Sequence, residues 1–287
     1  MLKAIKKLFS LAGLSRQSLS FWCLAAAARQ QGLLPLIAKL RRIVPDISNQ
    51  ELSCKNTFND YWEFKRRALQ AFQCRMMIKS IEDIGKKHLN IVDIGDSAGT
   101  HMLYLKTLAA DREIETLSVN LDKNAIEKIR ARGLNALLCR AEDLDLGQRD
   151  IDLFTSFQMI EHLHDPSKFF RSLAKRSKGN TMLVTLPYIK NSRVGLHTIR
   201  ERSVLIKITA EEEHIFELSP KDWELLMRHS GWRVVFSKIY YQYPKNIPVL
   251  SQLLAKFWRS TDYEGFWGAI LKKDTEISDR YADWGDI

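Results

Sequence analysis

The chain has 287 residues, of which 45% are hydrophobic and 27% are charged, and its formal net charge is +10. This is the composition of an ordinary globular protein that is long enough for one substantial α/β core and an appendage. No segment reaches the roughly 18–20 apolar residues that span a bilayer, and the four cysteines form neither a C-x-x-C pair nor a Cys/His cluster, so we predict neither a transmembrane helix nor a metal site.

The basic excess lies entirely in the first third of the chain. Residues 1–89 contain 16 Lys and Arg against 6 Asp and Glu, whereas residues 90–287 contain 28 of each. Residues 1–43 have the pattern of basic amphipathic helices, which either pack on their own domain or lie on an anionic membrane surface. Unpaired cysteines favour a reducing compartment. The expected location is cytoplasmic. The basic amphipathic pattern of residues 1–43 makes peripheral attachment to the inner face of a membrane the alternative.

A helix and then an alternating series of strands and helices follow along the chain. Residues 57–82 are predicted to be helical, and the pattern changes from residue 89 onward. The predicted strands cover residues 89–94, 114–120, 134–139, 151–157, 180–186, 232–240 and 266–271. The predicted helices cover residues 99–110, 124–132, 166–178 and 220–231, with Asp165 as an N-cap and Gly133 as a C-cap.

Repeated strand–helix–strand units predict an α/β fold with a doubly wound, mostly parallel seven-stranded sheet. Ligands of such sheets bind at the carboxyl ends of the strands. The predicted organisation has a basic helical N-terminal segment over residues 1–82, an α/β domain over residues 83–275 and a tail over residues 276–287. Two insertions, at residues 188–215 and 241–262, interrupt the α/β pattern and are expected to form a cap.

The most informative motif is the loop of small residues after the first predicted strand, from Gly95 to Gly99. It has three interpretations. The pattern G-x-S-x-G matches the nucleophile elbow of serine hydrolases, with Ser97 as nucleophile, but mainly helical residues precede it and no oxyanion motif accompanies it. A dinucleotide loop would have glycine where Ser97 stands. The third interpretation is a loop that brings the backbone close to a different nucleotide-like cofactor.

This last interpretation is supported by a resemblance to class I S-adenosylmethionine-dependent methyltransferases, which have a Rossmann-like fold. Asp93-Ile94-Gly95 and the small residues after it resemble their first motif. Residues 118–122 resemble the end of their second strand, residues 140–144 their adenine loop, and residues 151–166 the fourth-strand signature of the branch that includes ubiquinone-pathway methyltransferases. Residues 214–219, followed by Gly231-Trp232, match the same branch. The four motifs occur in family order over about two thirds of the chain.

The resemblance implies that the chain is an enzyme and that its cofactor is S-adenosylmethionine. It places contacts to that cofactor at Asp93, Gly95, Ser97, Gly99, Asn120, Leu121, Asp122, Ala141, Glu142, Gln158 and Met159. Three positions depart from the family pattern. Ser97 replaces a glycine, Asn120 stands where an acid usually binds the ribose, and Arg140 stands where an acid often precedes the adenine loop.

Methylation of an oxygen acceptor requires removal of its proton, and histidine is the usual base near neutral pH. His162 follows the fourth predicted strand and therefore lies at the correct sheet edge, and His197 lies in the first insertion. We take His162 as the first catalytic candidate and His197 as the second. The resemblance favours a small-molecule, sugar or lipid-linked acceptor and O-methylation.

Three other functions remain open at this point. The basic charge is compatible with RNA methylation, although residues 1–89 match no RNA-binding module, so nucleic acid is not the expected partner. A serine hydrolase that uses Ser97 is the alternative from another enzyme class. A non-catalytic cofactor-binding protein is the third.

Overall fold

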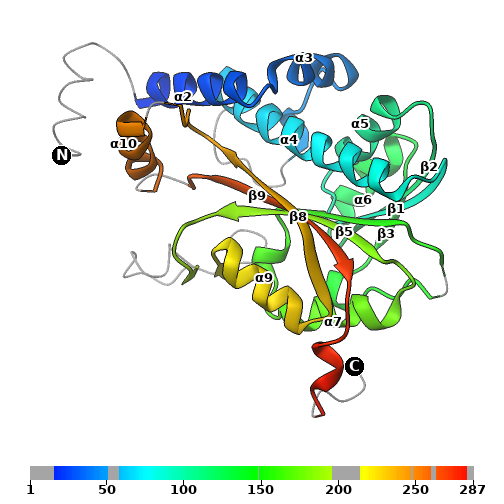
Figure 1. Cartoon of the computed structure of the whole chain (residues 1–287). Helices are drawn as coiled ribbons and strands as arrows, with labels where there is room; N and C mark the ends of the chain where they lie inside the picture. Colours follow the sequence, from blue (N-terminus) through cyan, green and yellow to red (C-terminus); the bar gives the residue numbers. More distant parts are fainter. Residues whose placement is uncertain are drawn as a thin grey trace, which may run out of the picture.

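The computed structural model describes residues 16–50, 58–147, 149–195, 214–246, 248–259 and 263–282. A seven-stranded sheet in the order β3-β2-β1-β4-β5-β9-β8 runs through it (Figure 1). Neighbouring strands from β3 to β5 are parallel, and β9 is antiparallel to both β5 and β8. The predicted α/β fold is therefore confirmed. The strands are β1 (His88–Ile94), β2 (Glu113–Asn120), β3 (Asn135–Leu138), β4 (Leu153–Phe157), β5 (Thr181–Tyr188), β8 (Trp232–Tyr241) and β9 (Gly265–Lys273).

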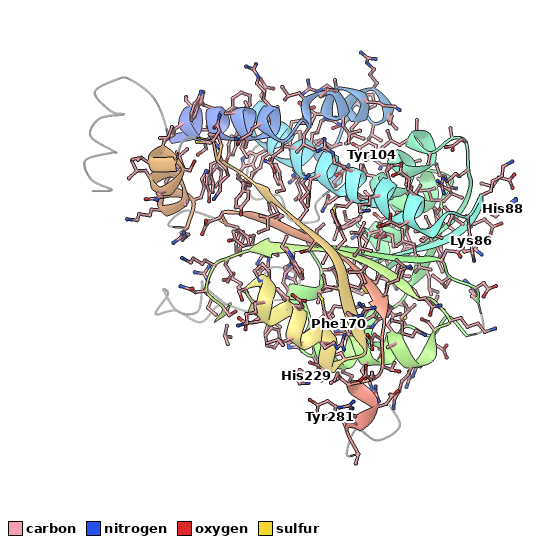
Figure 2. All side chains as sticks on the ribbon, in the orientation of Figure 1. Lys86, His88, Tyr104, Phe170, His229 and Tyr281 are labelled. Atoms are coloured by element: carbon pink, nitrogen blue, oxygen red, sulfur yellow. The ribbon has the colours of Figure 1, made fainter. Side chains whose placement is uncertain are left out.

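Helices cover both faces of this sheet. One face packs against α4 (Asp60–Ile84), α5 (Thr100–Leu108) and α6 (Lys123–Ala131), and the other packs against α7 (Pro166–Arg176) and α9 (Pro220–His229). Figure 2 shows Tyr104 of α5 on the first side and Phe170 of α7 on the second. Both side chains are fully buried, and the Trp232 indole N–H donates to the Phe170 carbonyl over 2.9 Å. Because the central strands are covered by apolar side chains on both faces, their sequences are continuous apolar runs.

Local signals set the ends of these helices. The Asp165 side chain accepts a hydrogen bond from Lys168 N over 2.8 Å at the start of α7, as the sequence predicts for an N-cap. Ser219 caps α9 in the same way, and Pro220 occupies its first position. Gly133, just beyond α6, has a φ of 72°, which confirms its place as the C-terminal stop. The boundaries predicted from periodicity are within two or three residues of those observed.

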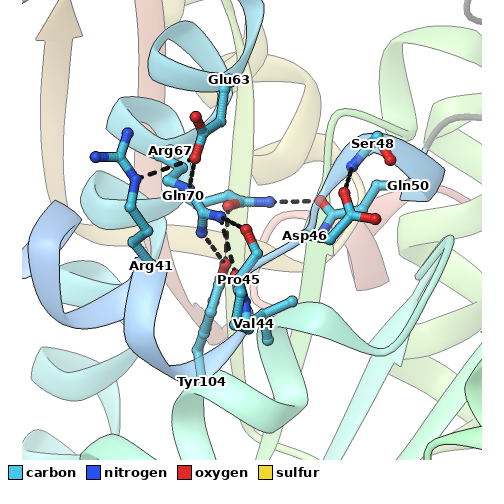
Figure 3. A network of polar contacts seen from close by, with 10 residues as sticks. All are labelled: Arg41, Val44, Pro45, Asp46, Ser48, Gln50, Glu63, Arg67, Gln70 and Tyr104. Atoms are coloured by element: carbon cyan, nitrogen blue, oxygen red, sulfur yellow. Dashed lines mark hydrogen bonds and ion pairs between the residues drawn. The ribbon is translucent and has the colours of Figure 1, made fainter. Parts of the chain in front are cut away.

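The described part of the basic N-terminal segment is built into the core. It consists of α2 (Arg16–Gln30), α3 (Leu34–Ile43), the short helix η1 (Ser48–Gln50) and α4, and its apolar side chains share one cluster with the sheet. Arg67 of α4 is fully buried and holds the chain after α3 by donating to the carbonyls of Val44 and Pro45 over 2.9 and 2.6 Å (Figure 3). Gln50 continues this network to Thr100 at the start of α5, with a distance of 2.6 Å. The N-terminal helices are thereby fixed against the first turn of α5.

The two insertions differ in structure. Within the first, the described residues form β6 (Arg193–Val194), which pairs with β7 (Phe216–Glu217). The second contains α10 (Pro248–Arg259), whose Leu254 and Trp258 pack against Cys23 and Leu24 of α2. A short helix, η4 (Ser278–Arg280), follows β9. Among the described residues, no helix is long and apolar enough to cross a membrane.

Candidate functional site

The loop between β1 and α5 has the backbone that its glycines predict. Gly95 has a φ of 91° and Gly99 a φ of 73°, both in the left-handed region that favours glycine. A Cβ atom at Gly95 would lie 2.7 Å from Met159 Cγ and 2.8 Å from Met159 Cβ. The loop therefore packs directly against the chain that leaves β4, and only glycine fits at this contact.

Asp96, which was not singled out from the sequence, organises this loop. One carboxylate oxygen accepts hydrogen bonds from the backbone N–H groups of Ala98 and Gly99 over 3.1 and 2.7 Å, and the other accepts from Ser118 Oγ of β2 over 2.7 Å. The Asp96 side chain is buried. A carboxylate that accepts two loop amides holds the loop in one conformation before any cofactor arrives.

Asp93 lies at the end of β1 with one oxygen engaged and one without a partner. Thr155 Oγ1 donates to its Oδ1 over 2.7 Å, whereas Oδ2 is buried and has no hydrogen-bond partner among the described residues. Burial and the nearby Asp96 carboxylate hold the pKa of Asp93 well above its usual range. A buried acceptor without a donor at the foot of this loop suits a ligand that brings its own N–H donors.

The end of β2 carries the next three predicted residues. The Asn120 side chain donates to the Asp96 carbonyl over 2.9 Å and accepts from the Asp122 N–H over 2.8 Å. Asp122 in turn caps α6 by accepting from Asn124 N over 2.8 Å, and Leu121 between them is 42% exposed. Asn120 therefore braces the glycine loop, and the Leu121 side chain is left on the surface beside it.

Ala141 and Glu142 form the short helix η2 (Ala141–Asp143) after β3. Both are partly buried, and Arg140 lies 3.6 Å from a Glu142 carboxylate oxygen. The Arg140 departure from the family pattern is thus compensated by a neighbouring acid rather than left unpaired.

Gln158 and Met159 leave the carboxyl end of β4. Gln158 has a φ of 56°, and among the described residues it is the one residue other than glycine with a positive φ. Its side chain donates to the Thr185 carbonyl of β5 over 2.9 Å, which compensates the unusual backbone. The Thr185 hydroxyl also accepts from Gln73 of α4 over 2.8 Å. A band of polar side chains therefore runs from β4 across β5 to α4.

His101 extends this band from α5. Its Nε2 is 2.8 Å from Gln73 Oε1, and its ring lies 4.6 Å from that of Phe157. Since Gln73 Oε1 can only accept, the bond places the proton on Nε2. Burial lowers the pKa of His101 to about 4, so the ring is neutral near pH 7. This histidine was not among the sequence candidates, although it follows Gly99 by only two positions.

A second polar cluster lies two residues beyond Met159, on the short helix η3 (Ile160–His162). Glu161 is fully buried, and burial raises its pKa. A carboxylate oxygen of Glu161 and one ring nitrogen each of His162 and His214 lie within 4.8 Å of one another. The grouping of these three residues could not be predicted from the sequence, because His214 is distant along the chain from Glu161 and His162. The first catalytic candidate, His162, lies in the cluster, whereas the second, His197, is outside the described residues.

The neighbours of His214 extend the cluster. Its Nδ1 is 2.6 Å from the Tyr263 hydroxyl, which donates to Glu217 Oε1 over 2.8 Å. Burial would raise the pKa of Glu217, but the nearby His214 ring and hydrogen bonds from Arg193 and Tyr263 lower it to about 2. Glu217 is therefore ionised and anchors this group.

A sequence model of the methyltransferase domain matches residues 61–236, more than half of the chain. The chain belongs to this methyltransferase family. It is an S-adenosylmethionine-dependent methyltransferase, and this replaces the hydrolase interpretation of the Gly95–Gly99 loop. The matched residues include every predicted cofactor contact. The narrower resemblance to the ubiquinone-pathway branch stays a prediction.

Comparison with solved structures supports the fold. A structure from Galdieria sulphuraria, assigned as a sarcosine dimethylglycine methyltransferase, aligns with a TM-score of 0.54 at 12% identity and covers 85% of this chain and 99% of its own. The [4+2]-cyclase SpnF aligns with a TM-score of 0.51 at 12% identity and covers 87% of this chain and 96% of its own. No curated protein sequence matches the chain. At this identity the two structures establish the fold and not the reaction.

The structure places the predicted cofactor residues in four groups, at or just after the carboxyl ends of β1, β2, β3 and β4. Asn120 and Met159 each contact the glycine loop directly. Ala141 and Glu142 follow β3, the next strand outward in the sheet. Asp96 and His101 are the two additions that the sequence analysis missed.

Proposed function

We propose that this methyltransferase transfers the methyl group of S-adenosylmethionine to a hydroxyl oxygen of a small-molecule or lipid-linked acceptor. The observation that carries the cofactor assignment is the Asp93 Oδ2 atom, a buried acceptor without a donor beneath a preformed glycine loop. The amino group of the methionine part of the cofactor supplies N–H donors of the right kind for it. The cofactor supplies the activated methyl carbon, and the protein supplies position and a site shielded from water.

The proposed cofactor contacts follow from the four strand ends of β1, β2, β3 and β4. Gly95, Ser97 and Gly99 present the loop backbone to the methionine part. Asn120, Leu121 and Asp122 take the ribose, and Ala141 and Glu142 lie along the adenine. Gln158 and Met159 lie beneath the cofactor, and the close contact between Met159 and Gly95 holds this side of the site in place.

Proton removal from the acceptor is proposed for His162, with His197 as the second candidate. Glu161 supports His162, because a carboxylate oxygen of Glu161 and a ring nitrogen of His162 lie within 4.8 Å of each other. A carboxylate beside an imidazole stabilises the protonated ring that forms when the acceptor loses its proton. The band that contains His101, Gln73 and Thr185 is proposed to contact the acceptor from the α4 side.

A lipid-linked acceptor at a membrane surface is favoured by the outer face of α2. Phe21 and Trp22 are 38% and 50% exposed there, and Arg29 follows on the same helix. Val249 of α10, which packs on α2, is 72% exposed. Exposed aromatic side chains beside basic residues are typical of proteins that bind the interface of anionic membranes. We propose peripheral attachment of this face to a membrane.

The test of the cofactor site is calorimetric titration with S-adenosylmethionine and S-adenosylhomocysteine. We expect wild-type protein to bind both and Asp93→Asn to bind about 10- to 100-fold more weakly, because a charge-assisted hydrogen bond contributes about 1.5–3 kcal/mol. Asp83→Asn, which loses only an exposed ion pair with Lys79, is the matched control. Equal affinity of wild type and Asp93→Asn would reject the assigned role of Asp93.

The acceptor class is tested separately. Transfer of labelled methyl groups to hydroxyl-bearing lipid extracts, compared with water-soluble hydroxyl compounds, identifies the class. Co-sedimentation with vesicles of phosphatidylcholine alone and with added phosphatidylserine tests the membrane face, and the Phe21→Ala/Trp22→Ala protein should lose the binding. Absence of sedimentation with both vesicle types would remove the membrane proposal and leave a water-soluble acceptor.

A further inference from the structure

Glu161 is an unusual residue for the interior of a protein. Its side chain is fully buried, and neither of its carboxylate oxygens has a hydrogen-bond partner among the described residues. Burying a carboxylate without compensation is very costly, so such groups are normally paired with a cation or coordinate a metal ion. The position of Glu161 on η3 is fixed, because the Ile215 N–H donates to its carbonyl over 2.8 Å.

Two imidazoles lie around this carboxylate. The ring centroids of His162 and His214 are 4.6 Å apart with an interplanar angle of 85°, and one ligand-type atom of each lies within 4.8 Å of the other and of a Glu161 oxygen. The bond from Ile215 to Glu161 holds the residue after His214 against η3 and so brings the two histidines together. The described chain thus joins two nitrogen donors and one oxygen donor from segments that are far apart in sequence.

The orientation of His214 has the form that metal-binding histidines require. The Tyr263 hydroxyl gives its proton to Glu217, so its oxygen accepts from His214 Nδ1–H. In the neutral ring the lone pair is then on Nε2. Metal-binding histidines almost always donate their other ring N–H in this way, which fixes the tautomer and the ring orientation. Arg193 pairs with Glu217 and completes the outer layer.

We infer that Glu161, His162 and His214 form a binding site for a divalent transition-metal ion, such as Zn²⁺, Co²⁺, Mn²⁺ or Fe²⁺. Two imidazoles and one carboxylate suit these ions and leave coordination positions open for water or a ligand. Metal–ligand bonds of about 2.0–2.2 Å place donor atoms roughly 3.3 Å apart. The three donor atoms lie within 4.8 Å of one another, so each pair is at most about 1.5 Å beyond the separation that a bound ion requires.

This site is separate from the cofactor contacts and goes beyond the proposed methyl transfer. It lies on η3, two residues past Met159, at the same edge of the sheet. With the ion bound, His162 is a ligand; without it, His162 is the proposed base. Metal binding can therefore be measured without cofactor or acceptor, and its outcome is independent of the test of Asp93.

The experiment is titration of the metal-free full-length protein with Co²⁺ and Zn²⁺. We expect one equivalent of Co²⁺ to bind with visible d–d absorption, and Zn²⁺ to displace it. Glu161→Gln keeps the shape of the side chain and removes its charge, and it should abolish the absorption. Tyr263→Phe keeps all three ligands but removes the acceptor for His214 Nδ1, so it should weaken affinity about 10- to 100-fold.

The matched control is His229→Gln. This histidine is the last residue of α9 and lies beside Tyr281 (Figure 2), outside the group of Glu161, His162 and His214, so its loss should leave metal binding unchanged. Near-ultraviolet circular dichroism checks that each variant is folded, and His162→Gln replaces Glu161→Gln if the latter does not fold. No stoichiometric Co²⁺ binding by wild type, or equal binding by Glu161→Gln, would overturn the inference and leave a carboxylate–imidazole ion pair.

Discussion

Substitution of Gly95 by alanine tests whether the contact between the glycine loop and the chain after β4 shapes the cofactor site. A methyl group there would lie 2.7 Å from Met159 Cγ and 2.8 Å from Met159 Cβ, about 1 Å inside the usual carbon–carbon separation. Met159 Cγ can rotate away, but Cβ is fixed by the backbone. The φ of 91° adds the strain that any L-residue meets there.

These two costs can be separated by a matched control. Gly133 has a φ of 72°, and a Cβ atom there would have nothing within 4 Å, so Gly133→Ala carries backbone strain of about 1–2 kcal/mol alone. Gly95→Ala carries the same strain and an overpacking cost of about 1–3 kcal/mol. We expect Gly95→Ala to lower the free energy of unfolding by about 2–5 kcal/mol and to weaken S-adenosylmethionine binding, because the loop must move away from Met159.

The assays are urea unfolding and calorimetric titration with S-adenosylmethionine on the two variants and on Gly95→Ala/Met159→Ala. The double variant removes the Cγ contact and leaves the Cβ contact, so it should recover part of the loss, and the difference measures the coupling. The explanation is wrong if Gly95→Ala and Gly133→Ala unfold within about 0.5 kcal/mol of each other and bind the cofactor equally.

Three further predictions concern buried polar groups. Asp96→Ala removes the hydrogen bonds to two loop amides and Ser118 and should cost about 2–4 kcal/mol in urea unfolding, whereas Asp96→Asn should cost less than half of that; equal costs would contradict the loop-holding role. Arg67→Met leaves the carbonyls after α3 without their donor and should cost about 3–5 kcal/mol, against under about 1 kcal/mol for the exposed Arg41→Met, and similar values would refute it. His101 has a folded-state pKa of about 4 against an ordinary 6.5, so its neutral form stabilises the fold above pH 6.5 and this contribution is lost as the pH falls to 4. Wild type should lose up to about 3 kcal/mol more than His101→Gln over that interval, and parallel pH profiles of unfolding would argue against a buried neutral ring.

The sequence determined the α/β pattern because each element carries its own signal. The strands around Asp93 and Thr155 are buried on both sides and read as apolar runs, and the helices show their caps at Asp165 and Gly133. The cofactor loop was equally readable, since small residues between a strand and a helix have few other uses. These features depend on neighbours within a few residues, so they can be inferred from one chain.

The G-x-S-x-G motif at Gly95–Gly99 did not by itself decide the enzyme class. The pattern around Ser97 fits both a nucleophile elbow and a cofactor loop, and motif order along the chain decided between them. The role of Asp96 could not be predicted from the sequence, because an acidic residue inside a glycine loop is not typical of any one function. Its role depends on the hydrogen bonds that it accepts from Ser118 of β2 and from two loop amides, which only the folded structure shows.

The remaining features were decided by tertiary structure alone. Nothing local predicts that β9 inserts between β5 and β8, or that α10 packs on α2 from the opposite end of the chain. The cluster of Glu161, His162 and His214 has the same origin, because the bond from Ile215 to Glu161 joins segments more than 50 residues apart. Periodicity and caps act through neighbouring residues and are written in the sequence, whereas the burial and grouping of distant charged side chains exist only once the chain has folded.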